Sequence, residues 1–134
     1  MRCPTRWIRP LAIMIAAIAA RGFQSPHRRP LSFALSCAGA DCPMLGGAPQ
    51  SVGMRSGFVR LSPGESVGWH STANNEESLV ILHGQGEALF DGFDKRQFVA
   101  PASLYIPPAT RHNVTNTGGG VLEYVYVVAP ASAM

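Results

Sequence analysis

Two segments of the chain carry side chains that could bind a metal ion. The first, residues 64–84, reads GESVGWHSTANNEESLVILHG and contains His70 and Glu77, seven residues apart. The second, residues 101–116, reads PASLYIPPATRHNVTN and contains His112. Two imidazoles and one carboxylate suit a first-row transition metal and leave coordination positions open for water or substrate. The sequence therefore predicts a metal site, provided that the fold brings the two segments together.

Short strand-like stretches separated by turn formers surround these side chains. The expected strands cover residues 54–61, 66–70, 77–83, 87–90, 97–99, 104–106, 112–116 and 121–128. Prolines and glycines lie between these strands, and Asp91-Gly92 is a hairpin signal. No segment after residue 51 has a helical period of useful length. About eight short strands with regular turns predict an all-β sandwich or barrel, such as a jelly roll.

The first third of the chain differs from the rest in charge. Residues 1–50 hold six arginines and one aspartate, a balance of +5, whereas residues 51–134 hold five basic and seven acidic side chains, a balance of −2. We therefore expect an irregular leader over residues 1–44 and one β domain over residues 45–134. The β domain has no basic stripe, which argues against nucleic acid as a partner.

The leader contains a wholly apolar run, LAIMIAAIAA, at residues 11–20. Ten residues are too few for a stable membrane span. A charged start and an A-x-A pattern at residues 17–19 resemble a secretory signal peptide, and a disordered leader is the alternative. Export and a cytoplasmic location therefore both stay open. So does the state of Cys37 and Cys42, which could pair in an exported protein or remain free thiols in the cytosol.

The two segments resemble the paired motifs of the cupin superfamily. In the first motif a glycine, a histidine, a glutamate and a second glycine recur at set spacings, which Gly64, His70, Glu77 and Gly84 match. In the second motif, the spacing of proline, histidine and asparagine is matched by Pro107, His112 and Asn116. The resemblance covers about residues 51–129 and implies a cupin-type jelly-roll β-barrel.

Three positions depart from the family pattern. Pro101 and Ala109 replace two glycines, and Thr72 stands where the family has a second histidine. The resemblance thus implies a metal site one ligand short, made of His70, Glu77 and His112. A threonine hydroxyl is a poor ligand, but Thr72 could hold a metal-bound water.

Other side chains are weaker candidates for the site. Glu76 is the alternative carboxylate, but six residues between Glu77 and Gly84 favour Glu77. His83 is expected at a strand end, about 20 Å from Glu77, because a strand rises about 3.3 Å per residue. Four aromatic residues could line a pocket or simply pack in the core: Trp69, Tyr105, Tyr124 and Tyr126. Two arginines could meet an anionic substrate or simply be solvated: Arg60 and Arg111.

The resemblance implies one divalent metal ion, which could be iron, manganese, nickel or zinc. It leaves three functions open. The first is a metal-dependent enzyme of oxygenase, isomerase or lyase type acting on a small polar substrate. The second is a non-catalytic barrel that binds a small ligand or acts as a sensor, with a degenerate metal site, and the third is an accessory subunit with an empty barrel. The expected partners are a small-molecule ligand and, by resemblance to small cupins, a second copy in a homodimer.

Overall fold

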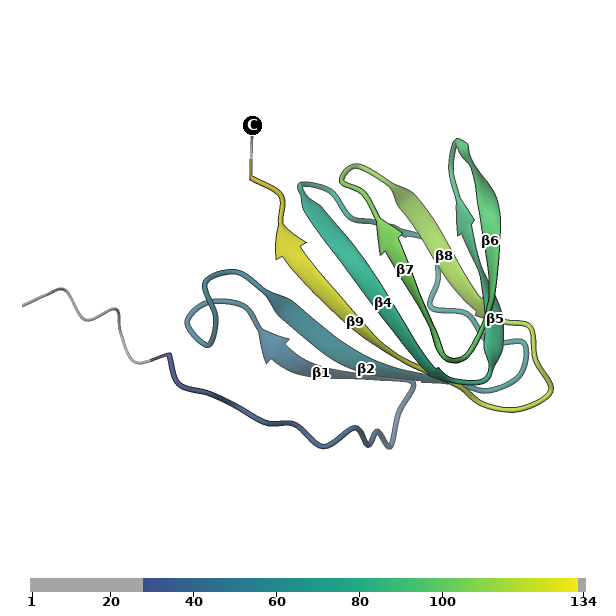
Figure 1. Ribbon diagram of the computed structural model, residues 1–134, viewed down its shortest axis with the longest axis horizontal. Helices are drawn as coiled ribbons and strands as arrows, with labels where there is room; N and C mark the ends of the chain where they lie inside the picture. Colours follow the sequence, from purple (N-terminus) through teal and green to yellow (C-terminus); the bar gives the residue numbers. More distant parts are fainter. Residues whose placement is uncertain (1–27, 133–134) are drawn as a thin grey trace, which may run out of the picture.

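The computed structural model describes residues 28–132, which form nine β-strands (Figure 1). The signal-like run at residues 11–20, Cys3 and His27 lie outside the described residues. The strands are β1 (Asp41–Gly46), β2 (Arg55–Leu61), β3 (His70–Ser71), β4 (Asn75–His83), β5 (Gln85–Phe90), β6 (Phe93–Val99), β7 (Ala102–Ile106), β8 (Arg111–Asn116) and β9 (Leu122–Pro130). In this part of the chain, no helix has the length and hydropathy needed to cross a membrane. The all-β expectation is confirmed.

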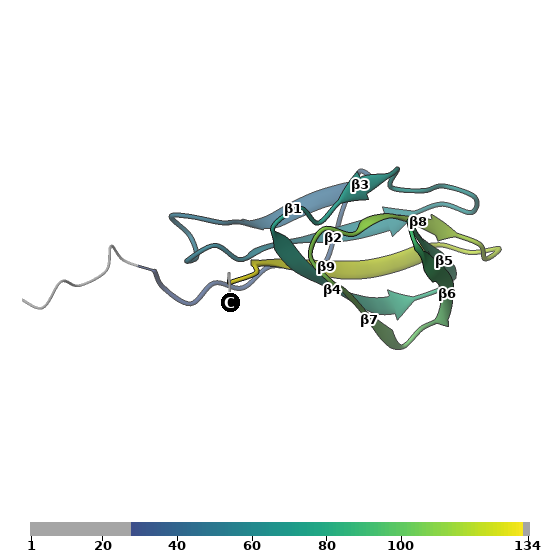
Figure 2. The same cartoon turned by 90° about the horizontal axis from the view of Figure 1, so that it is seen from above.

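The strands pair in two antiparallel sheets. One sheet has the order β1-β2-β9-β4-β7 and the other β3-β8-β5-β6. Both views show β8, β5 and β6 gathered at one end of the longer sheet (Figures 1 and 2). Neighbours such as β2 and β9 come from opposite ends of the domain, as in a jelly roll, so the expected jelly-roll barrel is confirmed.

The core lies between the sheets and follows the two-residue period of the strands. On β4, Glu77, Leu79 and Ile81 are buried, whereas Glu76 and Val80 are exposed. The largest fully buried apolar side chains are Leu61, Leu79, Ile81, Ile106, Leu122, Val59 and Val114. Burial of each of these side chains stabilises the fold by about 1.5–3 kcal/mol. The same alternation along β4 directs the Glu77 side chain inward.

Strand β1 was not expected from the sequence. Pro43 and two nearby glycines indicate turns, yet Asp41–Gly46 pairs with β2 at the edge of the long sheet. An edge strand tolerates a proline because one row of its N–H groups needs no ladder partner. The register also shifts between Pro43 and Leu45. Strand β1 begins at Asp41, and a disulfide between Cys37 and Cys42 joins it to the segment before it.

The strand expected at residues 66–70 is shorter and later than the sequence suggests. Ser66 makes only an isolated bridge with Thr115, and the regular ladder is limited to His70 and Ser71. Between them, Gly68 has a φ of +86°, which interrupts the extended backbone. This break places His70 at the start of its own short strand, beside β8.

The outer ends of the two motif segments are joined by hydrogen bonds. The N–H of Gly64 donates to the carbonyl of Asn116, at 3.0 Å, and the N–H of Asn116 donates to the carbonyl of Glu65, at 2.9 Å. The buried Asn116 side-chain amide donates to the carbonyls of Leu61 and Gly120. Asn116 therefore anchors the second motif segment to the first. His70 and His112 lie on the same two segments, a few residues away from this contact.

Candidate metal centre

The pairing of β3 with β8 places the two motif histidines side by side. His70 lies directly opposite His112 in the antiparallel register, although 42 positions separate them in the sequence. Directly opposite residues of neighbouring strands project to the same face. The two imidazole ring centroids are 4.2 Å apart.

Glu77 reaches the histidines from the other sheet. It lies near the start of β4, between Ile106 of β7 and Val128 of β9 in the register. Its Oε2 atom is 3.5 Å from Nε2 of His112. One ligand atom from each of Glu77, His70 and His112 lies within 4.8 Å of the other two. Two ligands of one ion are about 3–3.5 Å apart when metal–ligand bonds are about 2.0–2.2 Å, so this group is close to metal-binding spacing.

Backbone carbonyls set the tautomer of both imidazoles. Nδ1 of His70 is 2.9 Å from the carbonyl of Gly68, and Nδ1 of His112 is 3.2 Å from the carbonyl of Thr110. A carbonyl only accepts, so each Nδ1 carries the proton and each neutral ring keeps a lone pair on Nε2. This is the arrangement by which metal-ligating histidines are commonly oriented.

Burial acts on the charges of the group. Burial raises the pKa of Glu77 above its ordinary value of 4.5, although His70 and Arg55 act in the opposite direction. Burial also lowers the pKa of His112 below 6.5, against the effect of its hydrogen bond to Thr110. Both shifts favour uncharged side chains, so they disfavour an ion pair at this 3.5 Å contact. Nε2 of His112 is buried and has no hydrogen-bond partner. A divalent cation would satisfy both this lone pair and the carboxylate, so the three side chains fit a metal ion.

Thr72, at the position of the missing histidine, is buried and its hydroxyl is engaged. The hydroxyl donates to the carbonyl of Pro107 at 2.8 Å and accepts from the N–H of Thr110 at 3.0 Å. A hydroxyl has one proton and two lone pairs, so one acceptor position remains. Thr72 lines the same cavity as His70 and His112, but its hydrogen bonds hold the loop before β4 against the loop before β8. Its role in holding a metal-bound water stays a prediction.

The three side chains face a cavity of about 520 Å³ between the two sheets. Apolar side chains of both sheets form its walls, and Tyr124 and Tyr126 of β9 also line it. Trp69 and Tyr105 do not. Trp69 is 43% exposed and stacks under the guanidinium of Arg111, whereas Tyr105 is 61% exposed and donates to Glu76 on the outer face of the sheet. Of the four aromatic candidates, the two that line this cavity are therefore those of β9.

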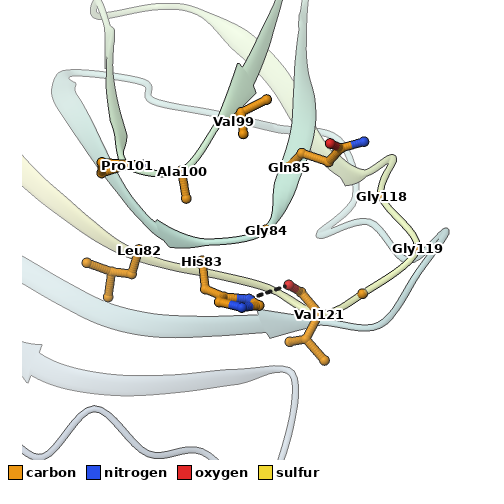
Figure 3. A pocket seen from close by; sticks show the side chains of 11 residues that line it. Leu82, His83, Gly84, Gln85, Val99, Ala100, Pro101, Gly118, Gly119 and Val121 are labelled. Atoms are coloured by element: carbon orange, nitrogen blue, oxygen red, sulfur yellow. Dashed lines mark hydrogen bonds between the residues drawn. The ribbon is translucent and has the colours of Figure 1, made fainter.

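His83 lies apart from the site, as its place at the end of β4 predicts. Its Nδ1 is 3.1 Å from the carbonyl of Val121, beside a second hollow of about 500 Å³ (Figure 3). Gly84, which follows it, has a φ of +83°, and a Cβ there would collide with the carbonyl of Val121. The glycine that ends the first motif is thus required by the close approach of two backbones.

Two charged residues of the cavity had no signal in the sequence motifs, namely Asp41 of β1 and Arg55 of β2. By contrast, the arginines that the sequence suggested for an anionic substrate are paired with carboxylates. Arg60 contacts Glu123 and Arg111 contacts Asp91, each at 3.1 Å. The inward two-residue period of β2 is the only pattern that could have identified Arg55 beforehand.

Comparison with known proteins agrees with this geometry. The family model described as "Cupin domain" matches residues 57–128, more than half of the chain. No curated protein sequence matches the chain.

Solved structures share the fold. A cupin protein from Bacteroides fragilis is 22% identical with a TM-score of 0.61, over 80% of this chain and 87% of that one. The cupin domain of Cnp3 from Schizosaccharomyces pombe is 17% identical with a TM-score of 0.60, over 67% and 63%. The DMSP lyase DddQ from Ruegeria pomeroyi is 18% identical with a TM-score of 0.58, over 71% and 48%. The chain spans less than two thirds of the last two proteins, and one of these neighbours is an enzyme. Given the extent of the family match and the shared barrel, this protein belongs to the cupin domain family.

Proposed function

We propose that this cupin binds one divalent transition-metal ion through His70, Glu77 and His112 and acts on a small polar molecule held in the adjoining cavity. One observation carries the proposal. The Nε2 lone pair of His112 is buried without a partner, and it lies 3.5 Å from a carboxylate oxygen of Glu77. An unsatisfied buried polar atom is costly, and a cation between the two groups would remove that cost.

A divalent metal bound there would activate dioxygen or polarise a carbonyl or hydroxyl group of the substrate. The chain's own groups have separate tasks. The carbonyls of Gly68 and Thr110 keep the histidine lone pairs directed away from the backbone. Glu77 supplies the negative charge, and apolar side chains line much of the adjoining cavity. Oxygenase, isomerase and lyase chemistry would all suit this arrangement, and a fold alone does not select among them.

A non-catalytic barrel that binds or senses a small ligand is the second candidate. It is favoured by Thr72, because a hydroxyl engaged by Pro107 and Thr110 leaves only three protein ligands for the metal. A weakly held ion would suit a sensor better than an enzyme that turns over repeatedly. A homodimer, which the resemblance to small cupins implies, remains a prediction that light scattering in solution would test.

Metal analysis by mass spectrometry tests the metal site. Purified wild type, His112→Ala and His83→Ala are each supplied with iron(II), manganese, nickel or zinc and then desalted. His83 is the matched control, since it is an exposed histidine of β4 outside the group. We expect about one ion per chain in wild type and in His83→Ala, and none in His112→Ala. Wild type that retains none of the four metals would contradict the proposal.

Turnover separates the two candidate functions once the metal is identified. The loaded protein is incubated with a panel of small carbonyl and hydroxy compounds, and products are followed by mass spectrometry and oxygen uptake. A product that depends on His112 supports the enzyme. Ligand binding that depends on His112, without any product, supports the sensor.

A further inference from the structure

Arg55 and Glu77 occupy the same cross-strand row on the inner face of the long sheet. Arg55 of β2 lies opposite Val128 of β9, and Glu77 of β4 lies opposite the same Val128 on its other side. Side chains of directly opposite residues project to one face, and neighbouring strands are about 4.8 Å apart. Arg55 is therefore two strands from Glu77 and faces the same cavity, which both residues line.

Arg55 has no carboxylate partner within residues 28–132, unlike the other arginine of β2. Arg60 forms an ion pair with Glu123, and no such pair involves Arg55. The stem of Arg55 passes close to Gly47, where an added Cβ would lie 3.5 Å from its Cγ. Its charge also lowers the pKa values of Glu77 and Tyr126, against the larger raising effect of burial on both. Arg55 is exposed, so its guanidinium is an unpaired cation at the solvent-facing wall of the cavity.

Tyr126 lines the cavity beside this cation. Tyr126 lies opposite Gly57, and its ring and hydroxyl occupy the space that a side chain at residue 57 would fill. Gly57 is two residues along β2 from Arg55, on the same face. Burial, the carboxylates of Asp41 and Glu77, and a hydrogen bond to Asp41 raise the pKa of Tyr126, so its hydroxyl proton is directed at Asp41. The guanidinium of Arg55 is therefore the donor that remains for a ligand on this part of the sheet.

The composition of the cavity favours a carboxylate as the anion that Arg55 receives. A guanidinium fork matches the two oxygens of a carboxylate. Within residues 28–132, Arg55 is the only arginine or lysine that lines the cavity, and Asp41 at the same wall would oppose the second charge of a phosphate. The remaining wall contains Val59, Leu79 and Val128, which suit a short aliphatic group.

We propose that Arg55 binds the carboxylate of a small monocarboxylate substrate whose other end faces His70, Glu77 and His112. This inference rests on the proposed function for the identity of that other end, but the binding of the carboxylate is a separate property of Arg55. The substrate class would then be short aliphatic acids, held at one end by charge and at the other by the metal centre.

Calorimetric titration tests the inference with propionate and its uncharged isostere, propionamide. The proteins are wild type, Arg55→Gln and Arg60→Gln, each loaded with zinc and also metal-free, with zinc content measured for every sample. Arg60→Gln is the matched control, because it removes an outward-facing arginine from the same strand. Loss of a charge-assisted hydrogen bond to a carboxylate weakens binding about 10- to 100-fold. We expect the Kd of propionate to rise by that factor in Arg55→Gln and to stay unchanged in Arg60→Gln. The Kd of propionamide should not change in either variant.

The outcomes separate this inference from the metal proposal. Equal propionate affinity in wild type and Arg55→Gln, with equal zinc content, would overturn the role of Arg55, as would the absence of saturable propionate binding to wild type. Arg55-dependent binding of inorganic phosphate that is tighter than that of propionate would overturn the carboxylate class. If wild type binds no metal but still binds propionate through Arg55, the inference stands and the metal proposal fails.

Discussion

Thr72 and Thr110 are joined by two reciprocal hydrogen bonds. The N–H of Thr72 donates to the carbonyl of Thr110 at 3.1 Å, and the N–H of Thr110 donates to the hydroxyl of Thr72 at 3.0 Å. The carbonyl of Thr110 also lies 3.2 Å from Nδ1 of His112. The residue at the missing-ligand position therefore supports the backbone that orients a ligand on the other motif.

Thr72→Val should destabilise the protein, because it removes the hydroxyl while keeping the shape of the side chain. It leaves the carbonyl of Pro107 and the N–H of Thr110 without a partner, at a cost of about 1–3 kcal/mol in the free energy of unfolding. Urea denaturation measures this change. Thr117→Val is the control, since Thr117 is exposed and its hydroxyl makes no hydrogen bond among the described residues, so the change should cost no more than about 0.5 kcal/mol. Unchanged stability with weakened metal binding would instead support the water-holding role.

Glu77→Gln should stabilise the metal-free protein at neutral pH. Because burial raises the folded-state pKa of Glu77 above its ordinary value of 4.5, the folded state loses stability as pH rises from about 4.5 through the folded-state pKa. Glutamine removes that loss and can donate to Nε2 of His112. The melting temperature of the variant should exceed that of wild type at pH 7, and the difference should vanish below pH 4.5.

Glu76→Gln serves as the control for this comparison. Glu76 is on the outer face of β4 and accepts a hydrogen bond from Tyr105, so its neutralisation should give no gain that grows with pH. Metal binding should survive in Glu76→Gln and be lost in Glu77→Gln. If the difference in melting temperature between wild type and Glu77→Gln does not change with pH, ionisation of the buried carboxylate is not the cause of that difference.

Ala109→Gly should stabilise the fold. Ala109 has a φ of +55°, and its N–H donates to the carbonyl of Ala73 at 2.8 Å, so this left-handed conformation is part of the contact between the two loops. The left-handed backbone destabilises a folded non-glycine residue by about 1–2 kcal/mol. Glycine avoids that strain, but its greater freedom stabilises the unfolded chain by about 0.4–1 kcal/mol. We expect a net gain between zero and about 1.6 kcal/mol by chemical denaturation. The same change at Ala129, in the extended strand β9, should instead lower stability.

Gly84→Ala should be far more damaging than Gly92→Ala, although both glycines have a φ near +80°. Both substitutions should lower the free energy of unfolding by about 1–2 kcal/mol, because alanine is strained in the left-handed backbone. Only the Cβ at residue 84 would also collide with the carbonyl of Val121, whereas nothing lies within 4 Å of one at residue 92. We expect Gly84→Ala to lower stability by at least about 3 kcal/mol by urea denaturation. Similar losses of stability in the two variants would show that the backbones at Gly84 and Val121 can move apart to accommodate the added Cβ.

Local patterns predicted most of the strands and which carboxylate lies beside the two histidines. The alternation along β4 separates Glu77, which is inside, from Glu76, which is outside, and the spacing to Gly84 pointed the same way. Two elements escaped this reasoning. Strand β1 was hidden by Pro43, which an edge strand tolerates, and the strand expected at residues 66–70 is broken by the left-handed Gly68.

The sequence by itself determined which side chains could bind a metal, because their types and spacings are local properties of two short segments. It did not determine their contact. His70 meets His112 through the pairing of β3 with β8, and Arg55 shares a row with Glu77 only because β9 lies between β2 and β4. Such neighbours are set by strand order and register across the whole barrel. Burial of His112 and the side chains that line the cavity, Tyr126 among them, follow from the same long-range pairing, so they were decided by the tertiary structure alone.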